Sequence, residues 1–336
     1  MKANITTTAI FAALSVLASA AVNIDWVTVG DPGNAANTSE FGSYKPGSVG
    51  YEYQIGKYEV SIGQYAEFLN NAAKNDAYGL WHPAMQSQGT IAGISRSGSE
   101  GSYVYSTFGS VNRPIAYVSW FDAARFANWI QNGQGSGSTE SGAYALNGAT
   151  SGIILAQTNA TIRLPTLDEW YKAAYYDPTP GAGGGDQYWR YATRSESLVS
   201  NSIDGNYFDG DYATTQSNVY DESQNYLTDV GAYSGKSSYY GTFDQLGNVM
   251  EWNDRFGMDE NTDPLVGRGV SGGAWSSGGP FPSALWFSNN NFLGIPQDEG
   301  HQSGFRLVSI SIPEPSTTLL TLLFSTGLLC RRRKNL

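Results

Sequence analysis

Hydrophobic residues repeat at regular spacing in only a few short segments of this chain, and this constrains its fold more than any other feature. Three segments have the period of an amphipathic helix, and each follows a short run rich in β-branched and aromatic residues. The 336 residues also include 40 glycines and 22 tyrosines, while only 15% are charged. Such a composition is typical of irregular loops tied down by aromatic rings. We therefore expect an α+β domain with little regular secondary structure.

Helical spacing and capping motifs predict where three helices begin. The first helix is expected directly after Ser61, with its apolar residues on one face. The second is expected from Ser119 to about residue 130, because Ser119 and Asp122 approximate a capping box. The third is expected after Thr166, which forms a complete capping box with Glu169.

The expected strands are short. Three precede the helices, at Tyr51–Val60, Pro114–Val118 and Thr161–Leu164. Three more are expected later, at Asn248–Trp252, Gly269–Trp275 and Gly304–Ile310. Stretches rich in glycine and serine, expected to be surface loops, lie at 89–101, 131–142 and 181–185.

The N-terminus has the features of a secretory signal peptide. Lys2 precedes an apolar run over Ala9–Leu17, and Ala18-Ser19-Ala20 then supplies the small-residue pattern that signal peptidase recognises. We expect residues 1–20 to be removed on export. The alternative is an ordinary buried helix, which leaves unexplained why this pattern coincides with the terminus.

The C-terminus carries a second targeting pattern in three parts. Pro313-Glu314-Pro315 is followed by the apolar segment 316–330 and by four cations at 331–334. The apolar segment is shorter than the roughly 20 residues of a relaxed membrane span, and the cations favour a cytoplasmic end. This order resembles the PEP-CTERM sorting signal of exported proteins from exopolysaccharide-producing bacteria. The resemblance implies that a membrane sorting enzyme processes residues 312–336, and that the protein reaches the cell surface, the outer envelope or the medium after transient membrane anchoring.

The domain between these ends, residues 21–311, is acidic and free of cysteine. Its net charge is near −15, because five of the 19 basic residues but only one of the 30 acidic residues lie in the end segments. A negative surface repels phosphate backbones and anionic lipid, so we expect no nucleic-acid partner. The only cysteine, Cys330, lies in the tail. The domain therefore has no disulfide, thiolate metal site or cysteine nucleophile.

Six motifs run through the domain in a fixed order. They are Gly56–Ser61, Pro114–Trp120 with Asp122-Ala123, Arg163–Trp170, Gly247–Trp252, Gly272–Trp275 and Gly304–Arg306. Together they resemble the formylglycine-generating enzyme, or sulfatase-modifying factor, family over about residues 27–308. The resemblance implies the C-type-lectin-like fold of that family, which is α+β and loop-rich.

This sequence lacks the residues that bind the metal ions of the family's two enzymatic branches. The resemblance places the two copper-binding cysteines of the oxidases at about Ser277 and Pro282, and neither residue can bind copper(I). The ergothioneine-type sulfoxide synthases use three histidines for iron, whereas this chain has only His82 and His301. We expect neither copper nor iron, and we expect both histidines to be surface or loop residues.

Calcium is the cofactor that the resemblance leaves open. Asp244, Asn248 and Glu251 match the family's calcium loop and offer the hard oxygen ligands that calcium prefers. The alternative is that Asn248 and Glu251 only hydrogen-bond turns around a buried Trp252. A second family site would lie near Asn206 and Asp221.

Five residues lie near the family's substrate groove by alignment: Trp189, Trp275, Ser277, Phe281 and Trp286. Aromatic side chains exposed there would stack on sugar rings, whereas buried ones would belong to the core. We expect a non-oxidase member that binds an exopolysaccharide or a surface protein. Two alternatives remain: an enzyme with non-standard chemistry in the same groove, and a structural protein of the exopolysaccharide matrix. An open cleft with aromatic walls would favour binding, and a closed hydrophobic plug would favour a structural role.

Overall fold

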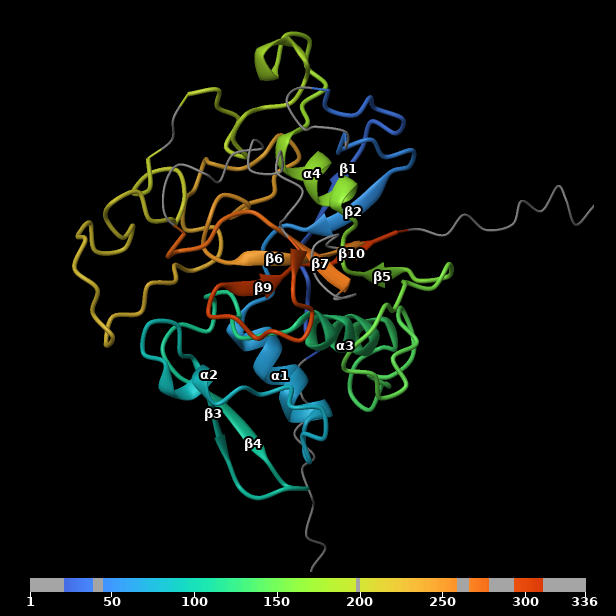
Figure 1. Ribbon diagram of the computed structural model, residues 1–336, viewed down its shortest axis with the longest axis vertical. Coiled ribbons are helices and arrows are strands. Elements are labelled where there is room, and N and C mark those ends of the chain that lie inside the picture. Colours follow the sequence, from blue (N-terminus) through green and yellow to red (C-terminus); the bar gives the residue numbers. More distant parts are fainter. Residues whose placement is uncertain (1–20, 39–44, 198–199, 259–265, 278–292, 311–336) are drawn as a thin grey trace, which may run out of the picture.

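The computed structural model of the chain describes residues 21–38, 45–197, 200–258, 266–277 and 293–310. Short helices and strands are joined by long loops (Figure 1), so the expected α+β class is confirmed. The predicted end segments, 1–20 and 312–336, lie outside the described residues, as do Phe281, Pro282 and Trp286. No helix in the described part of the chain is long and apolar enough to cross a membrane.

The three longer helices begin where the sequence predicts. They are α1 (Ile62–Ala72), α3 (Trp120–Gln131) and α4 (Leu167–Tyr175). In each, the side chain of the residue before the helix accepts the backbone N–H three residues on, and the side chain at that later position accepts in return. The sequence did not predict two shorter elements, α2 (Ala84–Ser87) and the 3-10 turn η1 (Gly183–Gly185).

The described strands form three small sheets. The first has the order β1 (Trp26–Val29), β2 (Tyr53–Gly56), β10 (Val308–Ser309) and β5 (Ile162–Arg163). The second is the hairpin of β3 (Ile94–Ser97) and β4 (Val104–Thr107). The third has the order β8 (Leu293–Gly294), β7 (Val266–Ser271), β6 (Met250–Met258) and β9 (Ser303–Phe305). Only β6 and β9 pair in parallel among the described strands.

One predicted strand is wrong. The segment Pro114–Val118 makes a single bridge, from Pro114 to Ser61, and no ladder. Tyr117 within it has a φ of +59°, a left-handed conformation that a strand does not contain. A second is split, because the predicted strand Gly304–Ile310 is the two strands β9 and β10 in different sheets. The remaining predicted strands form with shifted ends. The prediction for β6, for example, stops at Trp252, whereas the strand continues to residue 258 through a bulge.

Aromatic rings fill the space between the helices and the central strands. Figure 1 shows α1 and α3 on one side of β6 and α4 on the other. The ring of Phe126 on α3 lies 5.3 Å from those of Phe68 on α1 and Phe305 on β9, and 5.8 Å from that of Trp129. A second cluster, rich in tyrosine, packs around α4. A further cluster, which includes Tyr226 and Trp275, contains residues of the candidate site.

Candidate functional site

The predicted calcium ligand Glu251 forms a buried ion pair with Arg306. The Nε and Nη2 atoms of Arg306 donate to the two carboxylate oxygens at 2.5 and 2.7 Å, and the indole N–H of Trp170 donates at 2.8 Å. Both charged side chains are fully buried. Glu251 therefore already has strong protein donors on both oxygens, and a calcium ion would have to compete with a guanidinium for them.

The other two predicted ligands also have protein partners. Asn248 has a left-handed φ of +65°; its side-chain oxygen accepts from Asn206 at 3.0 Å, and its amide donates to Glu59 at 3.1 Å. Asp244 accepts the backbone N–H of Gly231 at 2.6 Å. Burial raises the pKa of Asp244 to about 6.

The predicted calcium ligands are close together in sequence, but their side chains do not form a metal site. In the described ranges, no group of three or more His, Cys, Asp and Glu side chains could hold a metal ion. Of the two residues expected at a second site, Asn206 donates to Asn248, whereas Asp221 accepts from Ser223 at 2.8 Å. This geometry fits the alternative in which the segment supports turns around Trp252, which is buried. Calcium binding stays a prediction.

The predicted groove residue Trp275 is the buried end of a column of rings. It stacks on Tyr226 at 5.1 Å, and Tyr226 stacks on Tyr220 at 5.8 Å, with interplanar angles of 9° and 6°. Only 2% of Trp275 is exposed, compared with 46% of Tyr220. Tyr212 packs against the column, and Tyr117 packs against the same cluster. We call these five aromatic residues the aromatic face.

The remaining groove predictions fall in different surroundings. Ser277 is a loop residue whose hydroxyl accepts the backbone N–H of Ala274 at 3.1 Å. Trp189 is partly exposed and donates its indole N–H to Asp177 at 3.0 Å, beside the tyrosine cluster of α4. The structure therefore brings Trp275 and Ser277 together, whereas Trp189 lies elsewhere, beside the tyrosine cluster of α4.

A cluster of polar groups that the sequence did not predict lies beside the aromatic face. His82 stacks on Tyr117 at 4.8 Å with an interplanar angle of 8°. Its Nδ1 accepts the backbone N–H of Ala84 at 3.1 Å, so the neutral ring carries its proton on Nε2. That Nε2 lies 3.9 Å from a carboxylate oxygen of Glu299. The second histidine, His301, packs edge-on against Trp275 with ring centroids 5.8 Å apart.

Burial changes the charges of this cluster. It raises the pKa of Glu299 to about 8, with further contributions from Asp122 and Asp76, and it lowers the pKa of His82 and His301. At neutral pH the cluster therefore presents a protonated carboxyl and two neutral imidazoles. Neither histidine stands out in sequence, since 219 positions separate them. Only the fold places both next to the aromatic face.

The geometry can now be compared with known proteins. A family model described as "Sulfatase-modifying factor enzyme 1-like domain" matches residues 23–310. The chain belongs to this sulfatase-modifying factor family. The C-type-lectin-like fold of the family, implied by the six motifs, is confirmed.

Two solved structures are similar to this chain in fold. CarF is 20% identical, with a TM-score of 0.52 and coverage of 86% of this chain and 99% of CarF. Variable protein 1 of Treponema denticola is 17% identical, with a TM-score of 0.51 and coverage of 86% and 95%. No curated protein sequence matches this chain. These likenesses show the fold alone, so function has to be argued from the residues of this chain.

The Glu251–Arg306 pair gives the first testable prediction. Glu251→Gln leaves a buried guanidinium facing a neutral amide, so we expect the free energy of unfolding to fall by about 3–5 kcal/mol. Urea denaturation in calcium and in chelator should show the same loss, and the exposed Glu52→Gln should show none.

The calcium prediction has the opposite signature in the same measurement. The wild-type protein would gain roughly 2.7 kcal/mol at a hundredfold excess of calcium over Kd, because the ion would bind only the folded chain. Glu251→Gln would lose that gain. A calcium-dependent stability of this kind would contradict the purely structural role of Glu251.

Glu299 gives a prediction about pH. A carboxyl whose pKa is higher in the folded chain stabilises it fully below the unfolded pKa, and this contribution is lost as pH rises through about 8. Glu299→Gln should remove that loss. Between about pH 5 and pH 9 the variant should lose less unfolding free energy than the wild type, by about 4 kcal/mol, which is roughly 1.4 kcal/mol for each pH unit up to pH 8. The exposed Glu222→Gln is the control, and equal pH profiles for Glu299→Gln and wild type would contradict the buried, protonated Glu299.

Proposed function

We propose that this protein is an exported, non-oxidase member of the sulfatase-modifying factor family that binds carbohydrate of the extracellular matrix at its aromatic face. Loss of the oxidase chemistry is supported by Ser277 and Pro282, which stand where the family's copper thiolates would be, and by a sole cysteine at position 330. Export is supported by the signal-peptide pattern at 1–20 and the PEP-CTERM-like pattern at 312–336.

The observation that carries the binding proposal is the column of stacked rings that ends at an exposed tyrosine. Buried Trp275 and Tyr226 hold the ring of Tyr220 parallel to themselves, so Tyr220 presents a fixed apolar face to solvent. A rigid aromatic ring binds the apolar face of a sugar with little loss of conformational entropy. Trp275 supports this ring and does not itself contact the ligand.

Polar groups around the face suit the hydroxyls of the same ligand. The amide of Gln88 lies 3.5 Å from the hydroxyl of Tyr220. Ser276 and His301 lie 3.5 Å apart at the other edge, next to Trp275. Neutral donors and acceptors beside an aromatic ring are the usual composition of a small-molecule site with a few orienting polar groups.

One observation supports the alternative of an enzyme with non-standard chemistry. Glu299 carries a proton at neutral pH and lies beside His82, and a protonated carboxyl at a binding face is the arrangement of a general acid. In this alternative a bound glycan would be cleaved or modified as well as bound.

Glycan binding can be tested with the full chain. We expect selected polysaccharides on a glycan array to be retained, and Tyr220→Ala to weaken their binding at least tenfold in calorimetry because the stacking surface is lost. Tyr239→Ala removes another exposed tyrosine and should leave binding unchanged.

The other outcomes separate the rivals. Shortened or chemically altered glycans after incubation would favour the enzyme. Retention of a surface protein with no glycan bound would identify a protein partner and contradict carbohydrate binding. Equal binding by Tyr220→Ala and wild type would remove the aromatic face from the proposal.

The export proposal has its own test. N-terminal sequencing of the extracellular form should find Ala21 first, because cleavage is expected after Ala20. Neutral residues in place of Arg331–Lys334 should reduce retention in the membrane, because the cytoplasmic positive flank is lost. An extracellular form that keeps Met1 would contradict the signal peptide.

A further inference from the structure

A cavity of about 380 Å³ lies away from the aromatic face, at the start of α1. Its wall is formed by residues 24–25 before β1, by the segment from Tyr58 to Gln64, and by residues near Asn112, Asp229 and Leu307. None of these residues belongs to the aromatic face. The volume is at the lower end of the range for small-molecule sites, so the cavity has room for one small molecule and not for a folded segment.

Hydrogen bonds between the wall segments hold the cavity open. The backbone N–H of Lys57 donates to the backbone carbonyl of Asp25 at 2.7 Å, and that of Val230 donates to the backbone carbonyl of Asn112 at 3.0 Å. The amide of Gln64 donates to the carbonyl of Asn23 at 2.7 Å. Because the segments are fixed to each other, a ligand would enter a site that is largely preformed.

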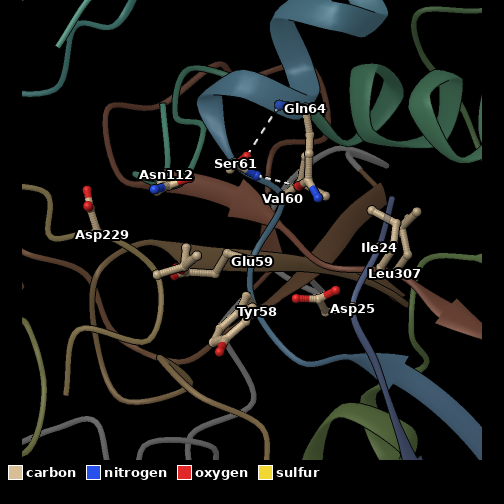
Figure 2. A pocket seen from close by; sticks show the side chains of 11 residues that line it. Ile24, Asp25, Tyr58, Glu59, Val60, Ser61, Gln64, Asn112, Asp229 and Leu307 are labelled. Atoms are coloured by element: carbon tan, nitrogen blue, oxygen red, sulfur yellow. Dashed lines mark hydrogen bonds between the residues drawn. The ribbon is translucent and has the colours of Figure 1, made fainter. Parts of the chain in front are cut away.

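The negative charge of the wall comes from its rim, where Asp25 and Asp229 are exposed. Asp25, Glu59 and Asp229 line the cavity, and no lysine, arginine or histidine does so among the described residues. Figure 2 shows Asp25 and Asp229 on opposite sides with Glu59 between them. Such a wall repels phosphate, sulfate and carboxylate groups and favours a cation.

Several polar atoms of the wall have no partner among the described residues. No hydrogen bond is formed there by the hydroxyl of Tyr58, the side-chain amide of Asn112 or the carboxylate of Asp229. Asp25 uses one carboxylate oxygen, which accepts from Asn23 at 3.2 Å, and its other oxygen is free. The wall thus offers acceptors for an ammonium group and donors for hydroxyl groups.

The floor of the cavity is more firmly fixed than its rim. Glu59 is buried, and its two oxygens accept from the backbone N–H of Val249 and the amide of Asn248, both at 3.1 Å. Burial and the nearby carboxylates of Asp244 and Glu251 raise the pKa of Glu59 well above its ordinary value, so the negative charge of the wall comes from Asp25 and Asp229. The position of Glu59 is set by the core. Specificity for a ligand therefore depends on the exposed rim residues.

From this combination we infer that the cavity binds a small molecule that carries both a protonated amine and hydroxyl groups, the chemistry of an unacetylated amino sugar. The ammonium group pairs with one of the two rim carboxylates, Asp25 or Asp229, and the hydroxyls bond to Asn112 and Tyr58. This site is independent of the aromatic face and goes beyond the function proposed for it.

The test is a calorimetric titration of the full chain with glucosamine, N-acetylglucosamine and glucose at about pH 6. Glucosamine should bind at least tenfold more tightly than the two neutral sugars, because it alone carries a protonated amine. The double variant Asp25→Asn with Asp229→Asn should lose at least tenfold in affinity for glucosamine. Both residues are exposed, so the variant should fold.

Matched variants make the result decisive. Asp211→Asn changes an exposed acid outside the cavity, and Tyr220→Ala removes the aromatic face; both should bind glucosamine as the wild type does. Equal affinity for glucosamine and glucose, an unchanged double variant, or binding of calcium with none of glucosamine would each overturn the inference. Failure here leaves the glycan array result at the aromatic face untouched, and the reverse also holds.

Discussion

The buried pair of Glu251 and Arg306 joins four elements of this fold, β2, β6, β9 and α4. Arg306 follows β9 and donates to Glu251 on β6, to the carbonyls of Gly56 and Lys57 at the end of β2, and to that of Phe243. All five guanidinium N–H groups are thereby matched. Taking two charges out of water costs several kcal/mol each, and only such complete pairing offsets that cost. Two sheets and the indole of α4 therefore meet at one ion pair, and the loops around it can stay irregular.

Buried tyrosines hold the interior loops of this protein in place, a role that long helices and strands fill in other folds. A loop that runs through the interior must find partners for its backbone carbonyls, and a tyrosine fills space with its ring while its hydroxyl supplies a donor. Tyr188 donates to the carbonyl of Ala35 at 2.7 Å, Tyr105 to that of Ala73 at 2.8 Å, and Tyr65 to that of Leu80 at 2.9 Å. The many tyrosines therefore compensate for the short strands, because their hydroxyls satisfy backbone carbonyls that no strand pairing reaches.

Local chemistry explains what the sequence could predict. A capping box acts over four residues, so the helix starts after Ser119 and Thr166 were predicted correctly, and the spacing of apolar residues predicted the start after Ser61. The absent strand near Tyr117 and the pairing of His82 with Glu299 depend on contacts between distant segments, which no local pattern encodes. The predicted calcium residues show the same limit, because their spacing is right for ligands while their partners are decided by Arg306 and Asn206. For Trp275, too, the sequence alone could not show whether the side chain is exposed for binding or buried in the core, and in the structure it is buried.

Asn248 lies between the two sites and keeps them separate. Its side chain donates to Glu59 at the floor of the cavity, and its carbonyl accepts the backbone N–H of Trp275 at 3.0 Å. A chain of contacts alone does not couple two sites, because coupling needs an element with two arrangements that each ligand favours differently. Asn248 is buried, has a left-handed φ, and bonds through its side chain to Asn206 and Thr228 as well. These bonds hold Asn248 in a single conformation, so it fixes the positions of both sites but does not carry a conformational change from one to the other. The cavity and the aromatic face should therefore bind their ligands independently, each on a rigid wall that the other's occupancy leaves unaltered.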